Sequence, residues 1–202
     1  MLNNEITIFD DFLDLEQFNV LQEQIMSMQF PWFYNKHVSM LPEHNNIQDP
    51  LAKETDGFHH VFYDKSDNAK SFTFSILNNL FIALEQKLNI STKDMLRIIA
   101  SMKTPKINFT EQNYNLPHID YNFPHKSLIY YINDSDGDTR IFNEKFVLTH
   151  NGSGIGFRDK FHIRERVTPK SNRLLLIDGL IYHTASNPIE AERRVIININ
   201  CL

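Results

Sequence analysis

The sequence contains 202 residues, which suits one domain and is too short for two full-sized catalytic domains. Hydrophobic residues make up 42% and charged residues 22% of the chain, so the composition excludes disordered and fibrous proteins. The formal net charge of −5, without a cluster of Lys and Arg residues, argues against duplex nucleic acid or an anionic membrane as the main partner.

The N-terminal segment begins with a short expected strand, Ile6–Phe9, followed by a helix. Within Asp14–Met28 the apolar residues recur three and four positions apart, as on the buried face of an amphipathic helix. This periodicity disappears between Phe30 and Lys70, where prolines and aromatic residues alternate with polar ones. We interpret Phe30–Lys70 as a long loop with strand pieces that could form a substrate lid.

Helical spacing resumes over Phe72–Leu88. Ser91 or Thr92 can cap a second, short helix through Ile99, with Asp94 favourably placed near its positive end. The first half of the chain is therefore predicted to be mostly helical.

After Met102 the pattern changes to short strands separated by turn residues. The expected strands are Lys106–Phe109, Lys126–Asn133, Thr139–Phe142, Gly154–Phe157, Arg173–Asp178 and Arg194–Asn200. Closely spaced strands without helices between them predict an antiparallel sandwich or barrel. We expect one domain over residues 1–202, mainly β with flanking helices, in which 1–102 supply helical support and a lid and 103–202 most of the β core.

The single cysteine, Cys201, cannot form an intrachain disulfide, which fits a reducing compartment. Charged residues interrupt the apolar residues near the N-terminus, and the longest purely aliphatic run is Leu174–Ile177. The sequence therefore predicts neither a signal peptide nor a membrane span, and we expect a cytoplasmic protein. The oligomeric state has no signature in the sequence.

A histidine and a carboxylate at alternate positions, His118 and Asp120, are the first candidates for chemistry. Alternate residues of an extended segment point to the same side, so both can bind one ion. With 9 histidines and 25 acidic residues in the chain, such a pair also arises by chance, and the pair alone is a weak signal.

Two residues further along the chain strengthen this signal: His183, after an apolar strand, and Arg194, at the start of the last strand. Two histidines and one carboxylate form the facial triad typical of non-haem Fe(II), which leaves three coordination sites open. A keto acid can occupy two of these sites and dioxygen the third. Arginine is the preferred partner for the far carboxylate of such a co-substrate, because it stays charged and binds bidentately.

These residues and their surroundings resemble the 2-oxoglutarate- and Fe(II)-dependent dioxygenases, in particular the prolyl 4-hydroxylase-like branch and small members found in phage genomes. The metal-ligand pattern matches at His118, Asp120 and His183, and the co-substrate arginine matches at Arg194. The strand and hairpin over Tyr130–Phe142 also resemble the family. The resemblance implies a double-stranded β-helix (jelly-roll, cupin-like) core that binds Fe(II), 2-oxoglutarate and dioxygen and hydroxylates a small-molecule or peptidyl substrate while releasing succinate.

Further co-substrate contacts are expected at Tyr131, Asn108 and Asn198. Asn108 occupies a position, ten residues before the first ligand, where the family sometimes has a tyrosine, and Tyr131 or Asn108 could donate a hydrogen bond to the co-substrate. Asn198 shares a strand face with Arg194. The hairpin departs from the family at Gly137-Asp138, where a double glycine is common.

Several alternatives stay open at this stage. Arg193 is the competitor of Arg194, and His162 followed by Arg173 repeats the spacing of His183 and Arg194. A metal-binding, redox-silent cupin-like barrel with a binding, isomerase or phage structural role is the second class of function. A zinc hydrolase is a third, since two histidines and a carboxylate also suit Zn(II).

Overall fold

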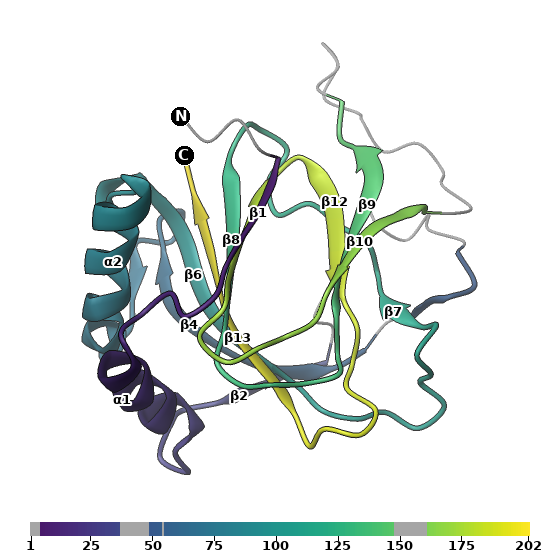
Figure 1. Ribbon diagram of the computed structural model, residues 1–202, viewed down its shortest axis with the longest axis horizontal. Coiled ribbons are helices and arrows are strands. Elements are labelled where there is room, and N and C mark those ends of the chain that lie inside the picture. Colours follow the sequence, from purple (N-terminus) through teal and green to yellow (C-terminus); the bar gives the residue numbers. More distant parts are fainter. Residues whose placement is uncertain (1–4, 37–48, 54, 148–160) are drawn as a thin grey trace.

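The computed structural model describes residues 5–36, 49–53, 55–147 and 161–202. Two β-sheets face each other, and two helices cover the outer side of the larger sheet (Figure 1). The architecture is a double-stranded β-helix with flanking helices, as the strand pattern and the family resemblance predict. Neither of the α-helices in this described part is long and apolar enough to cross a membrane.

The large sheet is antiparallel, with the strand order β1-β11-β8-β13-β6-β4-β2, and β5 pairs with β4 at its edge. Its strands are β1 (Ile6–Phe9), β2 (Phe33–Asn35), β4 (Gly57–Asp64), β5 (Ala69–Lys70), β6 (Met95–Lys103), β8 (Lys126–Tyr131), β11 (Leu174–Asp178) and β13 (Arg194–Cys201). Sequence neighbours are therefore rarely sheet neighbours, and strands from both halves of the chain build this sheet.

The small sheet has the order β10-β9-β12, and a separate parallel pair joins β3 to β7. The strands are β3 (Ala52–Lys53), β7 (Tyr114–Asn115), β9 (Thr139–Lys145), β10 (Ile163–Val167) and β12 (Ile181–Ala185). The helical elements are α1 (Leu15–Met26), α2 (Asn78–Leu88) and the 3-10 turns η2 (Phe74–Leu77) and η3 (Thr92–Asp94).

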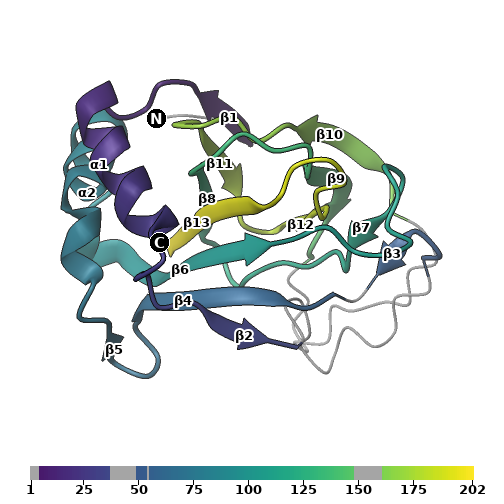
Figure 2. The same cartoon turned by 90° about the horizontal axis from the view of Figure 1, so that it is seen from below.

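The helices pack on the large sheet through one apolar face each (Figure 2). In α1 the buried residues are Phe18, Leu21 and Ile25, at the three- and four-residue spacing that predicts this helix. Across the interface, alternate residues of β13 such as Val195 and Ile197 point toward the helices. Burial of this apolar surface is the main force that holds the helices in place.

A second core fills the space between the two sheets. It contains Ile129, Leu175 and Ile196 from the large sheet and Ile141 and Ile181 from the small sheet. The face of the large sheet turned toward the small sheet is its inner face. Because helices cover one face and the small sheet the other, β11 is buried and apolar over its first four residues, Leu174–Ile177.

The helix expected through Ile99 is wrong. Ser91 does act as a cap, since its side chain accepts from the backbone N–H of Lys93, but only the turn η3 follows. From Met95 the chain forms β6, which pairs with β13 on one side and β4 on the other. Pairing on both sides with buried neighbours outweighs the local helical preference of this segment.

Other expectations from the sequence are partly corrected. The expected strand Lys106–Phe109 is a turn, and β4, inside the segment interpreted as a loop, is a full strand of the large sheet. β10 and β12 were not expected. The expected strand Gly154–Phe157 lies outside the described residues.

Candidate functional site

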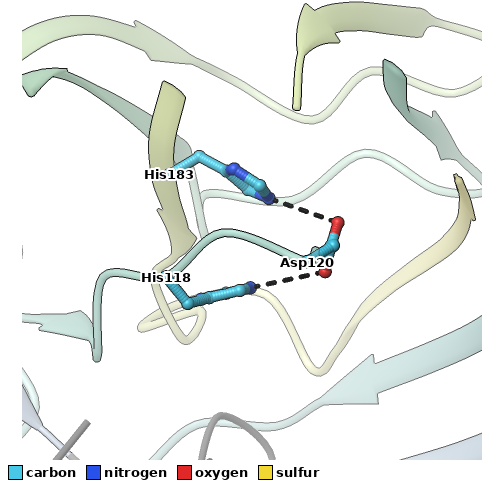
Figure 3. Close-up of side chains that lie close together, drawn as sticks. All are labelled: His118, Asp120 and His183. Carbon is cyan, nitrogen blue, oxygen red and sulfur yellow. Dashed lines mark ion pairs between the residues drawn. The ribbon is translucent and has the colours of Figure 1, made fainter. Parts of the chain in front are cut away.

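Three metal-ligating side chains converge at one end of the barrel, between the two sheets (Figure 3). His118 and Asp120 belong to the segment between β7 and β8, and His183 belongs to β12. The backbone of His118 exchanges two 3.0 Å hydrogen bonds with that of His183, which brings the imidazole rings to 4.9 Å between centroids. One potential ligand atom from each residue lies within 4.8 Å of the others.

The two imidazoles are oriented in the same way. Nδ1 of His118 lies 3.0 Å from the carbonyl oxygen of Leu116, and Nδ1 of His183 lies 3.1 Å from that of Ile181. A carbonyl oxygen only accepts, so each Nδ1 carries the hydrogen and each Nε2 presents a lone pair. The Nε2 atoms lie 4.0 Å and 3.7 Å from the Asp120 carboxylate oxygens.

The Nε2 atom of His183 is buried and has no hydrogen-bond partner among the described residues. A buried polar atom without a partner is rare and costly in a folded protein. Because this lone pair faces a second imidazole and a carboxylate, the residues fit a metal ion held by His118, Asp120 and His183.

The Asp120 carboxylate is almost fully buried, with 4% of its side chain exposed, and is held by several donors. Oδ1 accepts from Arg97 at 3.1 Å. Oδ2 accepts from Ser127 at 3.0 Å and from the Asn200 amide at 2.7 Å, and the Asn198 amide lies 3.4 Å away. These contacts hold the carboxylate in one orientation, as the outer partners of metal ligands usually do.

Opposing effects determine the protonation state of Asp120. Burial raises the pKa of this carboxyl, but attraction to His183 and His118 when these are protonated, attraction to Arg97 and the hydrogen bond from Asn200 together hold it well below its usual range. Asp120 is therefore an anion, the form that binds a metal.

Arg97 was not among the residues selected from the sequence, because its strand was interpreted as a helix. Replacing Arg97 with Gln removes the positive charge that lies beside Oδ1 of Asp120. We expect metal affinity to fall by about 10- to 100-fold, the usual cost of losing a residue that holds a metal ligand in place. Calorimetric titration with Mn(II) measures this. Arg164→Gln is the matched control, since Arg164 pairs with Glu5 on the surface; equal affinities for both variants would contradict the positioning role.

A second cluster lies on the inner face at the start of β13. Arg194 is 2% exposed, and its Nη2 donates to Oγ1 of Thr139 at 2.8 Å. The Tyr131 hydroxyl donates to the same oxygen at 2.7 Å, and the guanidinium lies 5.7 Å from the centre of the Tyr131 ring. Arg194 is four residues from Asn198, so this cluster lies roughly 13 Å along the strand from the level of Asn198.

The hairpin glycine Gly137 is required by the close approach of the backbone of Ser186 and Pro188, with the Arg194 side chain next nearest. A Cβ at position 137 would lie 2.7 Å from the carbonyl oxygen of Ser186 and 3.1 Å from Cδ of Arg194. At the next position, where the resemblance leads us to expect a second glycine, Asp138 forms an ion pair with Arg166 at 2.8 Å.

The alternative residues lie elsewhere. His162 is exposed and its Nδ1 lies 2.8 Å from a carboxylate oxygen of Glu144, while Arg173 pairs with Asp10 on the surface. Arg193 is partly exposed, in contrast to Arg194. Of the expected co-substrate contacts, Tyr131 adjoins Arg194, whereas Asn198 adjoins Asp120 instead.

Asn108 does not join either cluster. It is exposed in a turn with φ 64°, a left-handed conformation that asparagine tolerates. The expectation that Asn108 contacts the co-substrate is not supported by this position. Ser127 and Asn200 were missed, although the alternation of β13 places Asn200 on the same face as Arg194 and Asn198.

No protein-family model and no curated protein matches the sequence significantly. Solved structures do match by fold. The α-ketoglutarate-dependent epimerase SnoN from nogalamycin biosynthesis is 10% identical, with 98% of this chain and 78% of that chain covered and a TM-score of 0.60. A 2OG-Fe(II) oxygenase family oxidoreductase from Burkholderia pseudomallei is 10% identical, covering 98% and 85%, with a TM-score of 0.58.

A third match is a prolyl hydroxylase from Trichoplax adhaerens in complex with a hypoxia inducible factor peptide fragment. It is 14% identical, with 98% of this chain and 84% of that chain covered and a TM-score of 0.54. At these identities the likeness establishes a shared fold, and any activity has to be argued from the site itself.

Proposed function

We propose that this chain is an Fe(II)- and 2-oxoglutarate-dependent dioxygenase that couples decarboxylation of 2-oxoglutarate to succinate with hydroxylation of a second substrate. The observation that carries the proposal is the buried, unpartnered Nε2 of His183, which faces Asp120 and His118 inside the same barrel as the buried Arg194. The solved structures with this fold that are named for 2-oxoglutarate chemistry support it.

His118, Asp120 and His183 would hold the iron, with Arg97, Ser127 and Asn200 keeping the carboxylate in place. When bound, iron and 2-oxoglutarate supply the oxidising chemistry. The protein supplies orientation, since each imidazole is fixed through its Nδ1–H.

Arg194 would bind the far carboxylate of 2-oxoglutarate. It has no carboxylate within ion-pair distance in the described part of the chain, and its Nε has no hydrogen-bond partner there. A guanidinium fixed on one edge by Thr139 keeps other N–H groups for an anion. The apolar residues between the sheets, such as Ile129 and Ile196, exclude water from this region.

The second substrate is proposed to be a small molecule or a peptide side chain. A solved structure of SnoN contains nogalamycin RO, and that of the Trichoplax prolyl hydroxylase contains a peptide fragment, so both kinds of ligand occur on this fold. We further propose that residues 1–202 act as one catalytic domain, because strands before and after residue 102 are paired in the large sheet.

The test is an anaerobic titration of the metal-free protein with Fe(II) and then 2-oxoglutarate, followed by visible absorption. We expect the weak metal-to-ligand charge-transfer band of a chelated keto acid, and succinate after oxygen is admitted. Zn(II) is the control, because it binds the same ligands without this band. Metal binding without keto-acid chelation would instead favour the redox-silent barrel.

A further inference from the structure

Lys103, the last residue of β6, lies directly opposite Arg194 in the large sheet. Directly paired residues of antiparallel strands point to the same side, so Lys103 also faces inward. Both side chains are buried, since Lys103 is 4% and Arg194 2% exposed. Two cations therefore lie side by side in the interior of the protein.

Neither cation has an acidic partner within ion-pair distance in the described ranges of the chain. Nζ of Lys103 donates only to Oγ1 of Thr55, at 3.3 Å, and Arg194 donates to the hydroxyl of Thr139. The Thr55 hydroxyl also contacts the amide oxygens of Asn115 and Asn187, which are uncharged. The neighbours of both cations are thus polar but do not neutralise them.

This arrangement is unfavourable in the protein alone. Like charges directly opposite each other on neighbouring strands destabilise a sheet, and burial of an unpaired cation costs more. Burial lowers the pKa of Lys103 to about 7, and the charges of Arg194 and Lys106 act in the same direction, opposed only by Asp56. An anion bound between Lys103 and Arg194 would remove this penalty.

The position of Lys103 along β6 indicates which anion would bind between Lys103 and Arg194. Arg97, on the same strand, marks the metal end through its contact with Asp120, and Lys103 lies six residues beyond, roughly 20 Å along the strand. Lys103 is therefore level with Arg194, away from the metal. A keto acid chelated at the metal would point its far carboxylate along this face, and the long side chains of Lys103 and Arg194 would span the remaining distance to it.

We propose that Lys103 and Arg194 together bind the distal carboxylate of the co-substrate, so that the site selects dicarboxylic over monocarboxylic keto acids. The identity of this anion rests on the proposed function. The guanidinium offers parallel N–H donors to the carboxylate, and the ammonium adds a second positive charge on its other side.

The proposal predicts an unusual pH dependence of stability. Burial lowers the pKa of Lys103 to about 7 in the folded state, whereas in the unfolded chain the pKa is that of an ordinary lysine, 10.5. Over that interval the unfolded state binds more protons, so the Lys103 contribution to stability rises with pH. The charged groups around it are Arg194 on β13 and Lys106 and Asp56 in the adjoining loops. His59 on β4 also lies near, but burial lowers its pKa to about 4, so it stays neutral over this interval.

The variant Lys103→Met keeps the unbranched side chain up to its fourth heavy atom and removes the charge. We expect the metal-free variant to melt at the same or a higher temperature than wild type at about pH 6, with the gap narrowing toward about pH 9. The control is Lys106→Met, because Lys106 pairs with Asp56 near the surface. If Lys103→Met has a lower Tm than Lys106→Met, Lys103 stabilises the fold and the proposal is overturned.

The deciding experiment is calorimetric titration of the Fe(II)-loaded protein, without oxygen, with 2-oxoglutarate and with 2-oxohexanoate, its monocarboxylic analogue. Lys103→Met should bind 2-oxoglutarate about 10- to 100-fold more weakly, bind 2-oxohexanoate as wild type does, and retain its metal affinity. Lys103→Arg, which keeps the cation, should restore most of the loss. Unchanged 2-oxoglutarate affinity in Lys103→Met would overturn the proposal.

Glutarate, the same dicarboxylate without the keto group, separates this proposal from the proposed function. It needs no metal, and we expect it to raise the Tm of metal-free wild type but not that of Lys103→Met. If no keto acid chelates the metal yet glutarate behaves in this way, the proposed function fails and the two-cation site stands. If glutarate stabilises both proteins equally, Lys103 does not bind the carboxylate and the inference is wrong.

Discussion

Replacing His183 with alanine is expected to abolish measurable Fe(II) binding. Loss of a residue that merely orients a ligand costs about 10- to 100-fold in metal affinity, so loss of a ligand should cost more than that. The Nε2 of His183 has no other partner in the described part of the chain, so the variant forfeits no hydrogen bond of that atom. Anaerobic calorimetry measures the loss, with Mn(II) as an oxygen-stable substitute.

The matched control for this prediction is His162→Ala. His162 belongs to the same residue type, but it is exposed and pairs with Glu144, so metal affinity should stay at the wild-type level. His183→Gln, which nearly preserves side-chain volume, guards against a folding defect in the alanine variant. If folded His183→Gln bound the metal as tightly as wild type, the assignment of His118, Asp120 and His183 as ligands would fail.

Part of the metal-ligand set is predictable from the sequence, because two of its members are close together in the chain. His118 and Asp120 are two residues apart in an extended segment, and that spacing alone points both side chains the same way. The approach of His183 depends on a long-range backbone pairing with His118, which local spacing does not encode. The chemistry of a facial triad and the family resemblance link His183 to the pair, whereas the contact itself comes from the fold.

The inner face of β13 was also predictable, since polar and aliphatic residues alternate along it. Arg194, Ile196, Asn198 and Asn200 lie on the inner face, and the alternate residues Val195, Ile197 and Ile199 face the helices. The alternation does not predict whether each polar residue lies near the metal ligands or near the co-substrate. Asn198 was expected near the co-substrate and lies near Asp120 instead, because the strand carries it toward the metal end of the barrel.

Arg97 and Lys103 escaped prediction for one physical reason. Both belong to β6, whose apolar residues are consistent with either a helix or a strand over so few positions. The strand is selected by tertiary pairing, with β13 on one side and β4 on the other, and β4 itself comes from a segment without clear periodicity. Local sequence therefore does not predict the roles of Arg97 and Lys103, because β6 forms only through its pairing with these two strands.

The second large effect is expected at Arg194. Arg194→Met should weaken 2-oxoglutarate binding by more than about 100-fold, because two charge-assisted hydrogen bonds contribute about 1.5–3 kcal/mol each and 1.4 kcal/mol is tenfold in affinity. Metal binding should be unaffected, since the cluster lies roughly 13 Å along β13 from the level of Asn198. The charge-transfer band, titrated with 2-oxoglutarate under anaerobic conditions, measures the co-substrate affinity, and calorimetric titration with Mn(II) measures the metal affinity.

The neighbouring residue supplies the control for this prediction. Arg193→Met makes the same chemical change one position away, at a side chain that is partly exposed, and should leave 2-oxoglutarate affinity unchanged. Arg194→Lys should fall between wild type and Arg194→Met, because it keeps the charge and loses the bidentate geometry. Thr139 still accepts from Tyr131 in Arg194→Met, so the hydroxyl is not stranded and the fold should persist. Wild-type affinity in Arg194→Met, with loss in Arg193→Met, would move the co-substrate to the opposite face of the strand.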